Sequence, residues 1–114
     1  MKTNKYILMT TVIFLAFTFI LFSCKKKDKK PKDTTPPVIA LIGDASVYSS
    51  KDSVYVDAGA TATDNIDGNI TSKIQVANSV NIHVEGTYKV KYNVSDAAGN
   101  KAPEASRTVT VNIP

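Results

Sequence analysis

Residues 87–94 read Thr-Tyr-Lys-Val-Lys-Tyr-Asn-Val, and this stretch decides the fold class. Its large apolar side chains are evenly spaced, at Tyr88, Val90, Tyr92 and Val94. Successive side chains of a β-strand point to opposite faces, so this period of two predicts a strand with one buried face and one face in water.

A second strand of the same kind follows near the end of the chain. In residues 107–113, Val109, Val111 and Ile113 alternate with polar residues. The segment between the two strands carries turn residues at 96–100 and Pro103, which blocks a helix. We therefore expect the two strands to pair as an antiparallel hairpin.

Shorter apolar or alternating runs precede this hairpin and are each bounded by turn residues. They are Val38–Ile42, Val47–Tyr48, Val54–Val56, Lys73–Val76 and Val80–Val84. The first run is continuously apolar, which suits a strand covered on both faces. No segment after residue 36 shows a helical period, so we expect an antiparallel β-sandwich of about seven strands.

One short motif resembles a corner of the immunoglobulin fold. Gly86-Thr87-Tyr88-Lys89-Val90 is similar to the start of strand F in immunoglobulin domains, with Val90 in the place of the core cysteine. The resemblance implies a structural corner formed by Gly86, Tyr88 and Val90. In it the Tyr88 ring is buried and its hydroxyl bonds to the backbone.

Four motifs in order extend the resemblance to a family. They are residues 33–39, 58–71, 86–88 and 95–100. Together they resemble the bacterial immunoglobulin-like module of pesticidal crystal toxins and of many secreted proteins, a domain of unknown function. The resemblance implies an accessory module without catalytic residues, so no enzyme and no cofactor are expected.

The N-terminal segment predicts export. Lys2 and Lys5 precede a largely apolar run from Tyr6 to Phe22, which is typical of a signal peptide over residues 1–23. Leu21-Phe22-Ser23-Cys24 resembles a lipobox, and the resemblance implies cleavage before Cys24 and lipidation of its thiol with acyl chains such as palmitate. An uncleaved transmembrane anchor is the alternative, because 17 residues are just enough to span a bilayer.

The positive charge of the chain lies outside the predicted domain. Residues 24–36 hold six lysines against two aspartates, whereas residues 37–114 carry a net charge of −2. We expect residues 24–36 to be a lipidated, disordered tether, either fully hydrated or lying on anionic lipid. The domain lacks the basic surface of a nucleic-acid binder, so no nucleic-acid partner is expected.

The acidic loop from Asp64 to Asn69 is the most site-like stretch of the domain. Asp64 and Asp67 are weak candidates for calcium ligands, and Asp57 and Asp96 could approach them in the fold. The loop does not follow the calcium-loop pattern of EF-hands. Asp, Asn and Gly are also the residues that a tight turn requires, and this structural interpretation is the alternative.

Other candidate residues have structural or modification roles. His83 is the single histidine, and alternation places it on the solvent face of a strand, so zinc and nucleophilic sites lack partners. Asp33-Thr34-Thr35 and Asp52-Ser53-Val54 resemble an O-glycosylation pattern of exported bacterial proteins.

These features predict a lipid-anchored immunoglobulin-like module of the cell envelope with a structural, adhesive or partner-binding role. Its partners are the membrane, through lipid on Cys24, and an unknown envelope protein or glycan. The alternative is a carbohydrate-binding or calcium-dependent accessory module of a larger surface complex. Lys25 after the lipobox cysteine favours the outer membrane by analogy with lipoprotein sorting.

Overall fold

The computed structural model of the chain describes residues 29–114. The predicted signal peptide and the predicted lipidation site, Cys24, lie outside the described residues. Residues Lys32–Pro114 form one compact unit. Within residues 29–114, no helix has the length and apolar character that crossing a bilayer requires.

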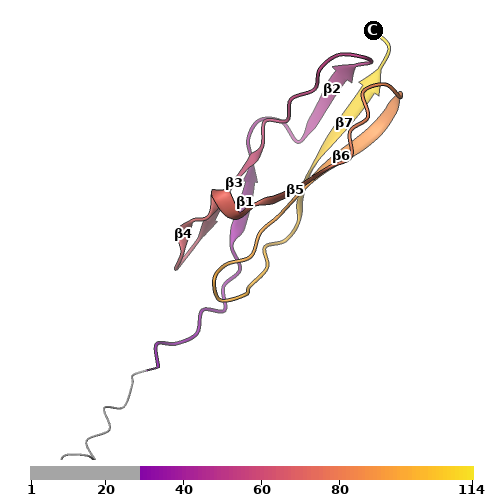
Figure 1. Cartoon of the computed structure of the whole chain (residues 1–114). Helices are drawn as coiled ribbons and strands as arrows, with labels where there is room; N and C mark the ends of the chain where they lie inside the picture. The colour runs from indigo at the N-terminus through magenta and orange to yellow at the C-terminus, as the bar shows by residue number, and fades with distance from the viewer. Residues whose placement is uncertain (1–28) are drawn as a thin grey trace, which may run out of the picture. The chain divides into compact units, whose positions relative to one another are not determined.

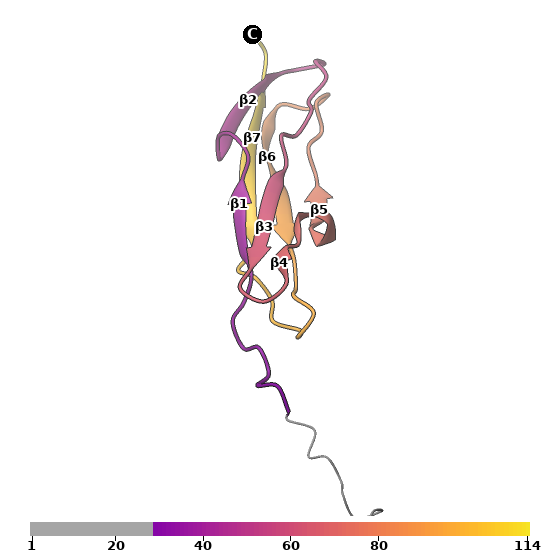
Figure 2. The ribbon, with the colours of Figure 1, turned by 90° about the vertical axis from the view of Figure 1, so that its left-hand side faces the viewer.

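The compact unit is a two-layer β-sandwich of seven strands (Figures 1 and 2). The first sheet has the order β1-β3-β4, and the second has the order β2-β7-β6-β5. The strands are β1 (Val38–Leu41), β2 (Ser46–Ser50), β3 (Ala60–Asp64), β4 (Gly68–Asn69), β5 (Gln75–Asn78), β6 (Gly86–Asn93) and β7 (Ala105–Asn112). One 3-10 turn, η1 (Thr71–Lys73), lies between β4 and β5. The predicted fold class is thus confirmed.

The predicted hairpin is the centre of the second sheet. Strands β6 and β7 pair antiparallel, from Gly86 opposite Val111 to Tyr92 opposite Ala105. One pair departs from the antiparallel expectation, because β2 runs parallel to β7. Gly43, with a φ of 76°, turns the chain out of the first sheet after β1, and the next strand then joins the free edge of β7.

The core fills the space between the two sheets in two clusters. Val90, Tyr92 and Val109 are fully buried and form the first cluster with Ala60. The second cluster consists of Ala62, Ile70, Val94 and Ala102. Burial of a valine-sized side chain contributes about 1.5 to 3 kcal/mol, so these aliphatic contacts stabilise the sandwich without a disulfide.

Two expectations about the strands that precede β3 are wrong. Strand β1 is not covered on both faces, because it lies at the edge of a sheet and Val38 is 65% exposed. The run Val54–Val56 forms no strand, and Val54 is 86% exposed. Only Tyr55 of this run packs against the core, so hydrophobic side chains alone did not produce a paired strand.

Two further segments differ from the alternation expected of them. Residues Val80–Val84 form a turn, because Asn81 Oδ1 accepts the backbone N–H of His83 and Asn81 O accepts that of Val84. Ile113 lies beyond the end of β7 and is exposed. Strand β3 is not predicted from the sequence. The residues that it buries, Ala60 and Ala62, are too small to produce a clear hydrophobic pattern.

Candidate functional site

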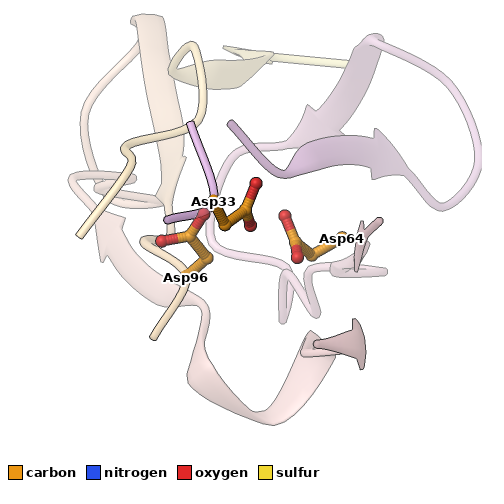
Figure 3. Close-up of side chains that lie close together, drawn as sticks. All are labelled: Asp33, Asp64 and Asp96. Atoms are coloured by element: carbon orange, nitrogen blue, oxygen red, sulfur yellow. The ribbon is translucent and has the colours of Figure 1, made fainter. Parts of the chain in front are cut away.

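Three aspartates meet at one end of the sandwich (Figure 3). Asp33 precedes β1, Asp64 is the last residue of β3, and Asp96 follows β6. One carboxylate oxygen of each residue lies within 4.8 Å of those of the other two. We call these three residues the aspartate cluster. It joins three segments that are far apart in the sequence.

The two carboxylate oxygens of Asp64 have different surroundings. Oδ2 accepts the backbone N–H groups of Ile66 and Asp67, both at 2.9 Å, and so forms the turn between β3 and β4. Oδ1 is buried and has no hydrogen-bond partner among the described residues. The structural turn considered for this loop is therefore present, and it leaves one oxygen of Asp64 for another ligand.

Asp96 is held in a tight loop by Asn100. The backbone N–H of Asn100 donates to Asp96 Oδ1 and its side-chain amide donates to Oδ2, each at 2.7 Å. Burial by itself raises the pKa of Asp96, but the hydrogen bonds from Asn100, together with those from the backbone of Gly99 and Ala98, outweigh it and lower the pKa. Asp96 is thus a carboxylate at neutral pH, and each oxygen keeps lone-pair capacity for a cation.

Asp33 ties the segment before β1 to the domain. Asn100 Nδ2 donates to the backbone oxygen of Asp33 at 3.1 Å, and Asp33 Oδ1 accepts the N–H of Thr35 at 3.0 Å. Pro37, which follows, is fully buried. The predicted tether was placed at residues 24–36, yet its last residues belong to the compact unit that begins at Lys32.

The cluster concentrates negative charge. None of the salt bridges found within residues 29–114 includes Asp33, Asp64 or Asp96. Two like charges at 4 Å repel by about 1 kcal/mol in water and by about 4 kcal/mol at the effective dielectric constant of a protein surface. Carboxylate oxygens without cationic side chains are the ligand set that hard cations such as Ca²⁺ and Mg²⁺ require.

The other two predicted acidic residues are not members of this cluster, although Asp67 borders it. Asp67 Oδ2 accepts the backbone N–H of Ala97 at 2.7 Å, so it fastens the β3–β4 turn to the loop that carries Asp96. Asp57 lies elsewhere, in contact with Arg107, Tyr92 and Tyr55. Of the four aspartates considered in the sequence, only Asp64 and Asp96 come together.

The contacts of Asp57 form a buried polar network. Arg107 is 1% exposed, and its Nη1 donates to Asp57 Oδ1 at 2.5 Å and to Tyr92 Oη at 3.0 Å. Tyr92 Oη donates to Asp57 Oδ2, and Tyr55 Oη donates to Asp57 Oδ1 at 2.8 Å. The remaining guanidinium donors reach the backbone oxygens of Asp44, Ile42 and Gly59. This network is structural, because its groups satisfy one another.

The predicted corner has the following geometry. Tyr88 Oη donates to the backbone oxygen of Val84 at 2.7 Å, Gly86 adopts a φ of 151°, and Val90 is fully buried. The Tyr88 ring is only half-buried, whereas the ring of Tyr92 is fully buried.

His83 is exposed, but it stands on a turn and not on a strand. Its Nδ1 lies 2.7 Å from Asp52 Oδ1.

Sequence reasoning missed two parts of these arrangements. Composition places Asp33 in the tether, although this residue stands just before the apolar run of β1. Arg107 has the same parity as Val109 and Val111, and this spacing was the signal that its side chain faces the core.

The sequence matches a known protein family. Residues 39–111 match the family described as a bacterial surface protein, Ig-like domain. The chain belongs to this family. An outer cell wall protein of Brevibacillus brevis (strain 47 / JCM 6285 / NBRC 100599) is 34% identical in an alignment of 101 positions, which covers 75% of this chain and 10% of that protein. The chain thus matches about a tenth of the length of this relative.

Solved structures include similar domains. A lipoprotein from Bacteroides thetaiotaomicron has a TM-score of 0.59 and 26% identity, over 68% of this chain and 38% of that chain. A structure of CBM51-2 in complex with GlcNAc and INT domains, from Clostridium perfringens ZmpB, has a TM-score of 0.53 and 37% identity. That match covers 68% of this chain and 17% of the other. The likeness is to one part of a larger protein in each case.

Proposed function

We propose that this surface Ig-like domain binds a divalent cation, Ca²⁺ in the first place, through Asp33, Asp64 and Asp96. The observation that carries the proposal is the buried Oδ1 of Asp64, which has no partner among the described residues, on a side chain whose carboxylate lies close to two others. A buried polar group without a partner costs about 1 to 3 kcal/mol. A bound cation removes this cost and the repulsion within the cluster.

The ligand set favours calcium over magnesium. Ca²⁺ accepts six to eight oxygen ligands in flexible geometry at about 2.3 to 2.6 Å, whereas Mg²⁺ requires a near-octahedral shell at about 2.0 to 2.1 Å. The cluster draws one residue from each of three segments, at 33, 64 and 96, and two of these lie in loops or before a strand. Such a site suits the ion that tolerates irregular coordination.

Cation binding gives the module a defined attachment to the chain that precedes it. Asp33 belongs to the segment leading into β1, while Asp64 and Asp96 belong to the sandwich. A cation held by all three residues fastens this segment to the end of the domain where the β3–β4 turn and the β6–β7 connection lie (Figures 1 and 2). The module then acts as a non-catalytic accessory unit of the cell envelope, and calcium stabilises the end of the domain that joins the preceding segment.

Lipid on Cys24 is the second element of the proposal. Lysine-flanked export features precede Cys24, and a lipoprotein is among the structurally similar proteins. A diacylglycerol thioether at this residue, with outer-membrane placement, holds the module at the envelope. Intact mass spectrometry of the mature protein tests this element. We expect an N-terminus at Cys24 carrying acyl mass, and an N-terminus at Met1 or an unmodified Cys24 thiol contradicts it.

Calcium titration with a thermal-melt readout tests the cation site. Ligand at 100 times its Kd stabilises the native state by about 2.7 kcal/mol, and each kcal/mol raises the Tm of a domain of this size by about 4 to 8 °C. We therefore expect a rise of about 10 °C or more at saturating Ca²⁺, and a smaller rise with Mg²⁺.

Two variants distinguish the site from general salt effects. Asp64→Asn keeps an acceptor oxygen for the turn but removes the charge, and should abolish the calcium response. Asp44→Asn is the matched control, because the Asp44 side chain is exposed and lies outside the cluster, and it should respond as the wild type does. No shift of the wild-type Tm at millimolar Ca²⁺ rejects the proposal.

A further inference from the structure

A polar pocket of about 390 Å³ lies beside the end of β6. Its polar lining consists of Lys73, Gln75, Asn93, Ser95 and Lys101. The volume is in the lower part of the range for small-molecule sites, which is about 300 to 1,000 Å³. We call it the lysine pocket. None of the residues discussed as candidate sites in the sequence lines it.

The backbone around the lysine pocket is held in place by sheet pairing. Gln75 of β5 lies opposite Asn93 of β6, and Ser95 pairs with Lys101 in an isolated antiparallel bridge. Two buried apolar residues complete the lining, and Ala102 N–H donates to Val94 O at 3.0 Å. The polar groups therefore project from a preformed frame, which lowers the ordering cost of binding.

The charge of the lysine pocket is opposite to that of the domain. Its lining contains Lys73 and Lys101 and no acidic residue. Neither lysine takes part in a salt bridge within the described part of the chain. Glu104 lies nearby, but Asn93 Nδ2 donates to its Oε2 at 3.0 Å and Lys91 Nζ lies 3.5 Å from its Oε1.

We propose that the lysine pocket binds an acidic saccharide, with its carboxylate between Lys73 and Lys101. The amide of Gln75, the amide oxygen of Asn93 and the hydroxyl of Ser95 supply donors and acceptors for sugar hydroxyls. No aromatic side chain lines the pocket, so stacking of a neutral sugar ring has no platform there. Recognition then depends on the charge of the ligand, and the lysines provide charge-assisted hydrogen bonds to it.

The lysine pocket and the aspartate cluster share one loop. Ser95 and Lys101 flank residues 96–100, which carry Asp96 and Asn100, whereas Lys73 and Gln75 lie on η1 and β5. One wall of the pocket therefore depends on the loop of the cation site and the other does not. None of the three cluster residues lines the pocket, so binding measured with and without Ca²⁺ separates the two proposals.

Isothermal titration calorimetry of the full-length protein in detergent tests the inference. The probes are a glucuronic-acid-terminated disaccharide and its uncharged glucose-terminated counterpart, each measured in Ca²⁺ and in EDTA. We expect binding of the acidic probe in both buffers, at an affinity at least about tenfold above that of the neutral probe.

Single variants locate the binding. Lys73→Gln and Lys101→Gln should each weaken binding of the acidic probe by about tenfold, as expected for loss of one hydrogen bond to a charged group. Lys89→Gln is the matched control, because Lys89 is exposed on β6 and does not line the pocket. It should bind as the wild type does.

Three outcomes overturn the inference. Equal binding of the acidic and neutral probes would show that the charge of the ligand is not recognised. Wild-type affinity of both pocket variants would show that the two lysines do not bind the probe. If inorganic sulfate or a peptide carboxylate binds as tightly as the acidic probe, the pocket recognises anions in general and not an acidic saccharide. If the protein binds the acidic probe but its Tm does not change with Ca²⁺, the result supports the lysine pocket and rejects the cation site.

Discussion

Arg107 forms an ion pair with Asp57 inside the sandwich, with 2.5 Å between Nη1 and Oδ1. Arg107 is nearly inaccessible, and Tyr92 bonds to both partners. Fifty positions separate the two residues in the chain, so this pair joins β7 to the loop before β3. The whole guanidinium group is occupied by oxygen acceptors, which is the condition for burying a charge without a large penalty.

Loss of Asp57 should destabilise the domain strongly. Asp57→Ala leaves the Arg107 charge buried without its partner, and removal of one member of such a pair typically costs about 3 to 5 kcal/mol. Chemical denaturation measures the loss. Asp44→Ala is the control, since Arg107 Nε bonds to the backbone oxygen of Asp44 and not to its side chain. Equal stability of the two variants contradicts a structural role for the ion pair.

Stability should fall at alkaline pH through Tyr92. Burial, together with the hydrogen bond to Asp57 and its negative charge, raises the pKa of Tyr92 to about 12, from an ordinary value near 10. A raised folded-state pKa means that this contribution is complete below pH 10 and is lost as pH rises towards 12.

Denaturation midpoints between pH 9 and pH 12 test this dependence. Tyr92→Phe keeps the ring in the core but removes the titrating group, so it should flatten the alkaline part of the profile. An unchanged alkaline slope in Tyr92→Phe assigns the titration elsewhere, with Tyr55 as the neighbouring group, because burial and Asp57 also raise its pKa.

The two tyrosines of β6 should differ in what truncation costs. Tyr92 is fully buried, so Tyr92→Ala is expected to cost about 3 to 5 kcal/mol. The motif by itself suggests the same range for Tyr88→Ala, but the half-buried ring lowers this expectation to below the loss for Tyr92→Ala. Tyr88→Phe should cost about 1 kcal/mol through loss of the bond to Val84 O. Urea unfolding of the three variants ranks these losses in the free energy of unfolding. A larger loss in Tyr88→Ala than in Tyr92→Ala contradicts the expectation that Tyr92 contributes more to the core.

Asn100 should couple the segment before β1 to the domain. Its side-chain amide donates to Asp33 O and to Asp96 Oδ2, so Asn100→Ala removes both contacts. Hydrogen exchange should show faster opening at residues 33–35, and calcium affinity should fall. Asn81→Ala is the control, because Asn81 forms its turn at His83, away from the cluster. Unchanged exchange at residues 33–35 in Asn100→Ala rejects the coupling.

Local pattern predicted the strands whose faces differ in polarity. Alternation placed β6 and β7 correctly because one face of each is buried against the other sheet and the other is in water. The same pattern failed at Val80–Val84, where Asn81 bonds to the backbone and forms a turn. It also missed β3, because Ala60 and Ala62 are too small to mark a core face.

The sequence by itself determined the β class, the immunoglobulin-like order of motifs and the division of charge between the N-terminal segment and the domain. These properties depend on neighbouring residues, and period-two patterning and local composition record them directly. Tertiary structure alone decided that Asp33, Asp64 and Asp96 converge while Asp57 pairs with Arg107. Which carboxylates share a site depends on sheet order and on where loops meet in space, and no local pattern encodes that geometry.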